Sequence, residues 1–226
     1  NKGLILSIMF KNAQREDIIS ITLYAFDNVR IKKEKSSRKY MSDEQLQKFI
    51  DYEPGEKGKA KILQHMFIFS VFAGGLRFSD VIELQWKHYS EDEARISKTI
   101  RKTRKQHSFK IGTKAVEILS KYKTNKTKSD DVIFPFADID ERYFRDEEYR
   151  EYILKRATSL SYCHMTHIGE KLKLPFKLSF HVSRHTMATR ALNKGMRIEH
   201  VSKLLQHSDL GVTQIYARII NEELDK

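Results

Sequence analysis

The chain contains a single cysteine and has no apolar run of membrane-spanning length. Because Cys163 is the only cysteine in 226 residues, a disulfide framework and a cluster of thiolate metal ligands are excluded. A reducing, cytoplasmic environment fits this composition. The apolar stretch at residues 4–10 is too short to cross a bilayer, and it lacks the small residues of a signal-peptide cleavage site.

Other absences concern phosphate and metal chemistry. The sequence has no glycine-rich phosphate loop, no internal repeat and no group of carboxylates at metal-ligand spacing. We therefore predict that the protein needs no cofactor and no metal ion. The chain begins at Asn1, within an apolar pattern and without a methionine, so we expect it to be part of a longer protein.

Positive charge is in excess. Lysine and arginine number 42 against 30 acidic residues, which gives a net charge of +12 and a pI near 9.6. This surplus favours a polyanionic partner, most simply nucleic acid, because each neutralised phosphate releases counterions. A ribosome-associated or merely soluble basic protein would show the same surplus, so charge alone does not decide the function.

The apolar pattern predicts a mainly α fold with a small three-stranded antiparallel β-sheet. Segments 86–89, 94–100 and 107–111 are separated by charged turns and are expected to form the sheet. Residues 1–26 have apolar residues at roughly helical spacing, and a basic stretch at 30–39 reads as a linker. Helices are expected at 43–51, 59–73, 79–84, 113–122, 146–173, 181–193, 198–205 and 212–217.

Local signals support several of these boundaries. Ser42 with Gln45 resembles a capping box, and Gly195 stands where a C-terminal helix glycine is expected. Gly74 and Gly75 should end the helix that begins at residue 59, and Ser79-Asp80 looks like the cap of the next one. We expect Cys163 and Trp86 to lie in or near the core.

A histidine and an arginine open the helix predicted at 181–193. His181 and Arg184 are three residues apart, so they share one helix face. At a helix N-terminus such a pair suits an anion, because the dipole and free N–H groups add to the side chains. Taken alone, a capping histidine and a solvated arginine would explain the pair better.

Further candidates occur in order along the chain. Arg77 follows directly after the Gly74-Gly75-Leu76 step, at the end of a buried helix. Lys102 lies in the turn of the predicted sheet, and His207 precedes Tyr216 by nine residues.

Together these positions resemble the tyrosine recombinases of the phage integrase family. That family carries an arginine after a glycine-leucine step, a hairpin lysine, a His-x-x-Arg pair, a later histidine and a tyrosine about nine residues beyond it. The resemblance covers about residues 40–220. The six matching residues are, in order, Arg77, Lys102, His181, Arg184, His207 and Tyr216.

Two departures leave the subfamily open. Gln206 stands where the family usually has glycine, and Val182-Ser183 replaces the commoner acidic-hydrophobic pair. Neither removes a catalytic group. Lys98, Lys102 and Lys105 all lie near the hairpin, and we choose Lys102 because Lys102-Thr103 best fits the Lys-Thr pattern of the family.

The resemblance implies DNA cleavage through a 3′-phosphotyrosine and a free 5′-hydroxyl, followed by attack of a partner strand. Tyr216 would be the nucleophile, His181 a general base or acid, and Lys102 the proton donor to the leaving 5′-oxygen. The phosphate would be bound by Arg77, Arg184 and His207. Asp80 would either hold Arg77 by an ion pair or simply favour the helix dipole.

The resemblance also implies DNA contacts and a domain division. Residues 1–30 would be the end of a core-binding (SAM-like) domain, 31–40 a linker and 41–226 the catalytic domain. The loop at 121–128 is expected to be plain surface rather than a DNA contact. Hairpin residues expected to grip the DNA backbone are Lys98, Arg101, Arg104, Lys105 and Lys110.

The partners implied are double-stranded DNA attachment sites and a homotetramer on DNA, built from subunits compatible with a monomer in solution. Accessory DNA-bending or directionality proteins are further partners, and no membrane is expected. Neighbouring subunits in the family often exchange C-terminal segments, and residues 221–226 are a candidate tail for this exchange.

Integration of a mobile element is favoured over chromosome-dimer resolution.

Two alternatives to recombination stay open. A type IB topoisomerase has similar chemistry but relaxes DNA without a partner duplex. A non-catalytic DNA-binding protein on the same fold would have no need of Tyr216.

Overall fold

The computed structural model describes residues 2–20, 22, 39–55, 58–207 and 209–224. The chain divides into two units, Asn1–Ser37 and Arg38–Lys226, which are described one at a time. In the first unit, α1 spans Lys2–Arg15. Most of the expected linker lies outside the described residues, and the assignment of residues 1–30 to a core-binding domain stays a prediction.

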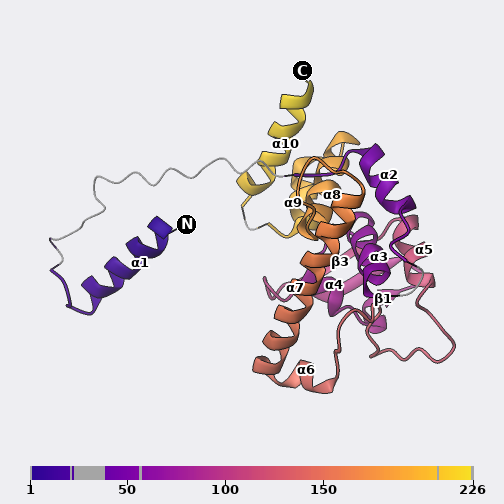
Figure 1. Ribbon diagram of the computed structural model, residues 1–226, viewed down its shortest axis with the longest axis horizontal. Helices are drawn as coiled ribbons and strands as arrows, with labels where there is room; N and C mark the ends of the chain where they lie inside the picture. Colours follow the sequence, from indigo (N-terminus) through magenta and orange to yellow (C-terminus); the bar gives the residue numbers. More distant parts are fainter. Residues whose placement is uncertain (1, 21, 23–38, 56–57, 208, 225–226) are drawn as a thin grey trace. The chain divides into compact units, whose positions relative to one another are not determined.

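The second unit is mainly helical, as predicted (Figure 1). Three helices, α2, α8 and α9, have the predicted bounds, and α7 is the longest of the described helices, at 25 residues. The helices are α2 (Asp43–Asp51), α3 (Lys59–Phe72), α4 (Phe78–Ile82), α5 (Thr113–Ser120), α6 (Glu141–Arg145), α7 (Glu147–Lys171), α8 (His181–Asn193), α9 (Ile198–Leu205) and α10 (Gly211–Leu224).

Helix α3 lies at the centre of the second unit. All of its residues from Leu63 to Val71 are buried, because α4, α5, α7 and α8 contact it. A helix buried on every side needs apolar residues on every face, which explains why its sequence shows no amphipathic period. The buried Gln64 donates from Nε2 to the carbonyls of Phe49 and Tyr52, at 2.7 and 2.5 Å.

The N-terminus of α2 is fixed by the predicted capping box. The Gln45 N–H donates to Ser42 Oγ at 3.2 Å, and the Ser42 N–H donates to Gln45 Oε1 at 3.0 Å. One residue earlier, the Met41 N–H donates to Thr186 Oγ1 of α8 at 3.0 Å. The start of the second unit is thereby tied to the helix that carries the His-x-x-Arg pair.

The three strands β1 (Tyr89–Ser90), β2 (Arg95–Thr99) and β3 (Gln106–Lys110) form an antiparallel sheet in the order β1-β2-β3. Ile96 pairs with Phe109, and Lys98 pairs with His107. These four side chains are buried, because alternate strand residues point to the same face. The first predicted segment, 86–89, is wrong as a strand over most of its length: residues Trp86–His88 form a 3-10 helix.

Two predicted helix ends need correction, and one helix was missed. Helix α4 begins at Phe78, so that Arg77 rather than Ser79 occupies the extended cap position. Helix α10 continues to Leu224, well beyond the predicted end at residue 217. The unpredicted α6 is a single turn capped by Asp140, whose side chain accepts the Tyr143 N–H at 2.9 Å.

Helix α7 shows one wrong prediction of burial. Cys163 is exposed, because it lies on the face of α7 that turns away from the core. Trp86 is partly buried against the core, as predicted. No helix in the described part of the chain combines the length and the apolar character that crossing a bilayer requires.

Candidate active site

A double-glycine turn brings the two candidate arginines together. Gly74 and Gly75 have φ of +67° and +68°, a left-handed backbone that turns the chain sharply after α3. Arg77 follows at the start of α4. The Gly75 carbonyl accepts a hydrogen bond from Nη1 of Arg184 at 2.7 Å, so the turn that positions Arg77 also holds Arg184.

Arg184 is built into the interior of the unit. Its side chain is only 4% exposed, and its Nη2 donates to the carbonyl of Leu205 at the end of α9. Both acceptors are backbone carbonyls, so these two bonds fix the position of the guanidinium group. The arginine therefore joins three segments and presents a fixed cation.

A pocket of about 400 Å³ opens over these arginines. Arg77, His181 and Arg184 line it, with apolar and hydroxyl side chains such as Phe78 and Tyr162 as neighbours. Two guanidinium groups and an imidazole in one pocket without an acidic lining residue favour an anion such as a phosphodiester. Among the described residues, the other candidates, Lys102, His207 and Tyr216, do not line it.

The candidate nucleophile is held by a histidine outside the six candidate residues. Tyr216 on α10 is 1% exposed, and its Oη lies 2.7 Å from Nδ1 of His185. The ring of His185 in turn meets that of His181 edge to face, with centroids 4.5 Å apart. The sequence could have indicated His185 as a site residue, because it lies one helical turn after His181 and so shares its helix face.

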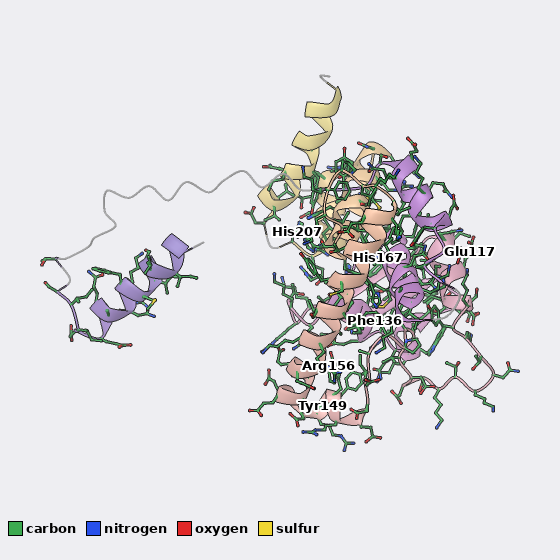
Figure 2. The ribbon with its side chains drawn as sticks, viewed as in Figure 1. Glu117, Phe136, Tyr149, Arg156, His167 and His207 are labelled. Carbon is green, nitrogen blue, oxygen red and sulfur yellow. The ribbon has the colours of Figure 1, made fainter. Side chains whose placement is uncertain are left out.

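The end of α9 carries the second candidate histidine. His207 follows α9 (Figure 2), and its Nδ1 lies 2.8 Å from Thr213 Oγ1 of α10. Before it, Gln206 adopts a left-handed backbone, with φ 49° and ψ 45°. The backbone N–H groups of Gln206 and His207 close the helix by donating to Lys203 and Ser202.

The hairpin separates the lysines near it into different environments. Lys102 is exposed in the turn between β2 and β3. Lys98 is 7% exposed, and its Nζ lies 3.5 Å from Glu83 Oε2. Burial lowers the pKa of Lys98, while Glu83 and Asp80 oppose that shift. A buried, paired ammonium does not fit the expected contact of Lys98 with the DNA backbone.

The remaining hairpin cations also differ from one another. Arg101 is partly buried and pairs with Glu151 and, at 3.6 Å, with Glu83. Arg104, Lys105 and Lys110 are exposed, as a contact with DNA requires.

Asp80 connects the first arginine to the hairpin. It is fully buried; its Oδ2 lies 4.0 Å from Arg77 Nη1, and its Oδ1 accepts the Arg101 N–H at 3.3 Å. Burial raises the pKa of Asp80, and the nearby Lys98 opposes the rise. The predicted ion pair between Asp80 and Arg77 is thus present, at the longest distance that counts as an ion pair. Asp80 also binds the backbone of the hairpin.

The second unit is similar to known recombinases. The phage integrase family matches residues 39–223. Tyrosine recombinase XerC of Leptospira interrogans is 27% identical over 97% of this chain and 67% of its own length. Tyrosine recombinase XerD of Brucella melitensis is 28% identical over 96% of this chain and 69% of its own.

Solved structures agree on the fold. The Tn1549 transposon integrase in complex with a circular intermediate DNA superposes with a TM-score of 0.66 at 15% identity, over 96% of this chain and 76% of that one. A lambda integrase dimer bound to a COC′ core site gives a TM-score of 0.64 at 17% identity, over 93% of this chain and 69% of that one.

Proposed function

Since the chain belongs to the phage integrase family of tyrosine recombinases, we propose how its own residues perform site-specific DNA recombination. Members of this family cleave and rejoin DNA through a phosphotyrosine intermediate. The residues proposed here for that reaction are Arg77, Lys102, His181, Arg184, His207 and Tyr216.

The observation that best supports this proposal is the pocket lined by Arg77, His181 and Arg184. A scissile phosphate bound there gains charge on its non-bridging oxygens as the phosphorus becomes five-coordinate. Guanidinium groups stay charged at any physiological pH and donate in a planar, bidentate geometry. Fixed donors of this kind each contribute about 10²–10³-fold to a rate.

In the proposed first step, Tyr216 Oη attacks phosphorus and the bond from phosphorus to the 5′-oxygen breaks. The phenol proton passes to His181, and Lys102 gives a proton to the leaving 5′-oxygen. Free tyrosine has a pKa near 10, so a base and a positive field are both needed near neutral pH. Because Tyr216 is buried against His185, its side chain or α10 must shift to reach a phosphate in the pocket.

His207 is proposed to donate a hydrogen bond to the same phosphate. When Nδ1 accepts the Thr213 hydroxyl, the imidazole proton is on Nε2, which is the donor the phosphate needs. The phosphotyrosine bond conserves the energy of the broken phosphodiester. Religation by a 5′-hydroxyl reverses the same proton transfers and consumes no nucleotide.

The proposed substrates are two double-stranded attachment sites held by a homotetramer, with Arg104, Lys105 and Lys110 on the DNA backbone. We propose integration of a mobile element as the setting. Accessory DNA-bending or directionality proteins would act on the same sites.

A suicide-substrate assay without metal or ATP tests this function. A nicked duplex from the junction of the encoding genetic element should give a covalent protein–DNA adduct that survives SDS. Tyr216→Phe should abolish the adduct and keep DNA affinity. Tyr152→Phe, which alters an exposed tyrosine on α7, is the matched control and should leave the adduct unchanged.

The alternatives give different results in the same experiment. Tight binding without any adduct would indicate a DNA-binding protein on the recombinase fold. Relaxation of a supercoiled plasmid without a partner duplex, together with no strand exchange, would indicate a topoisomerase.

A further inference from the structure

Two side chains of the hairpin contact the last turn of α9. Thr103 Oγ1 donates to Gln206 Oε1 at 2.7 Å, across 103 positions of sequence. His107 Nε2 lies 2.9 Å from the carbonyl of Leu204. The turn that carries Lys102 is therefore joined to the segment that carries His207.

Gln206 is an unusual residue for its position. Its left-handed backbone is one that a side chain with a Cβ adopts at a cost, and glycine adopts freely. The closing hydrogen bonds of α9 need only the backbone at this position, so glycine would end the helix equally well. What the glutamine adds is its amide oxygen, which binds the Thr103 hydroxyl.

The ammonium of Lys102 depends on its backbone for placement. In the described part of the chain Lys102 makes no hydrogen bond or ion pair. The start of the turn is held by Arg101, whose N–H donates to Asp80. On the other side of Lys102, the side chain of Thr103 binds Gln206.

We propose that Gln206 is a positioning residue that, through Thr103, fixes the turn carrying Lys102 beside His207. This inference rests on the proposed function, in which Lys102 protonates the leaving 5′-oxygen. The turn is closed by its own backbone hydrogen bonds, from the Arg104 N–H to the Ile100 carbonyl at 2.8 Å and from the Ile100 N–H to the Lys105 carbonyl at 3.0 Å. Loss of the bond from Thr103 to Gln206 leaves these in place and removes one of the two hairpin contacts with the end of α9. Lys102 then occupies the productive position for a smaller fraction of the time, and protonation of the leaving group slows.

The test compares two nicked duplexes that differ in one atom. One carries the ordinary 5′-oxygen at the scissile bond, and the other carries sulfur there. A thiolate leaves without a proton near neutral pH far more readily than an alkoxide, since thiols have pKa values near 8.5. A defect that acts through Lys102 is therefore rescued by sulfur, whereas a defect in folding or phosphate binding is not.

Gln206→Gly and Thr103→Val should each slow adduct formation on the oxygen substrate by about tenfold, which is the size of effect expected when one polar contact between two coupled residues is lost. On the sulfur substrate both should come within about twofold of the wild type, as should Lys102→Ala. Thr103→Ser keeps the hydroxyl and should restore the wild-type rate. The Thr103→Val/Gln206→Gly double variant should be no slower than either single variant.

A matched control separates the side-chain contact from the backbone. Lys173, after α7, also has a left-handed backbone, with φ 51°, and does not line the pocket. Lys173→Gly should leave the ratio of oxygen to sulfur rates unchanged. In Gln206→Gly the relief of the left-handed backbone offsets the lost bond to Thr103 and the greater freedom of glycine in the unfolded chain, so its unfolding temperature should stay close to that of the wild type.

Either of two results would overturn the proposal. Gln206→Gly could cleave the oxygen substrate at the wild-type rate, or its defect could be equal on both substrates. Failure of the proposed function itself looks different: the wild-type protein would then form no adduct with either substrate.

Discussion

Replacing Gly75 by alanine should weaken both folding and cleavage. At its φ of +68° a Cβ costs about 1–2 kcal/mol. That Cβ would lie 2.8 Å from Met187 Cε and 3.1 Å from Leu205 Cδ2. The end of Met187 can move, so crowding adds about 1 kcal/mol, the low end for overpacking. The free energy of unfolding should fall by about 2–3 kcal/mol.

Two other glycines separate these contributions. Gly195 has φ +81° and nothing within 4 Å of an added Cβ, so Gly195→Ala measures the backbone cost alone, about 1–2 kcal/mol. Gly169 lies within α7, where an added Cβ would be 2.8 Å from Leu178 Cβ. That atom moves only with its backbone, so crowding costs about 3 kcal/mol, of which the better helix propensity of alanine recovers about 1 kcal/mol.

Cleavage distinguishes Gly75 from both controls. Its carbonyl accepts the Arg184 hydrogen bond, so a shift of this turn moves a guanidinium that the proposed function places on the phosphate. Adduct formation by Gly75→Ala should slow by about ten- to hundredfold, because the rate falls by about 10²–10³-fold when one oriented hydrogen-bond donor is lost completely. Gly169→Ala should keep the wild-type rate despite a comparable loss of stability.

Urea unfolding measures the three free energies, and adduct formation is measured at conditions where each variant stays folded. Equal stability of the Gly75 and Gly195 variants would refute the crowding estimate. A Gly169→Ala enzyme as slow as Gly75→Ala would refute the link between the turn and Arg184.

Three further predictions concern other parts of the unit. Lys98→Met should form the adduct within about threefold of the wild-type rate, while Lys102→Ala should be at least about 10²-fold slower; the reverse order would assign the general acid to Lys98. Ser42→Ala should lower the free energy of unfolding by about 1 kcal/mol in urea, with cleavage unchanged, and no loss would contradict the role of the cap. Burial lowers the pKa of His65 from 6.5 to about 4, so the unfolded state takes up the proton first as pH falls between these values. Acid should therefore destabilise the wild type more than His65→Gln over that range, and equal losses in the two proteins would be the contrary result.

The elements that local sequence determines were predicted well. The bounds of α9 were correct because an apolar period runs through that helix. The end of α8 was correct because Gly195, with its left-handed φ, follows it. The capping box at Ser42 was readable for the same reason, since both partners lie within one turn. The start of α4 was misplaced because Arg77 caps it without a side-chain hydrogen bond.

The environment of the hairpin lysines could not be predicted in this way. Strand alternation places Lys98 on the same face as Ile96, but a lysine is normally read as solvent-exposed. What makes its burial tolerable is Glu83, which lies 15 positions away and also accepts the Tyr143 hydroxyl at 2.8 Å. Contacts between residues so far apart in the chain produce no periodic pattern in a single sequence, so the burial of Lys98 could not be predicted.

The same limit explains why the residue types of the site could be predicted but not its resting state. Arg184 is fixed by carbonyls of the α3–α4 turn and of α9, so folding of the unit alone sets its position. Tyr216 depends instead on a polar contact with His185 and on packing of α10 against α8 and α9. Arg184, which the proposed function places on the phosphate, is thus pre-organised, whereas the proposed nucleophile Tyr216 would have to exchange its contact with His185 for one with phosphorus. The sequence therefore predicts Tyr216 as the nucleophile without showing where its side chain rests in the folded protein.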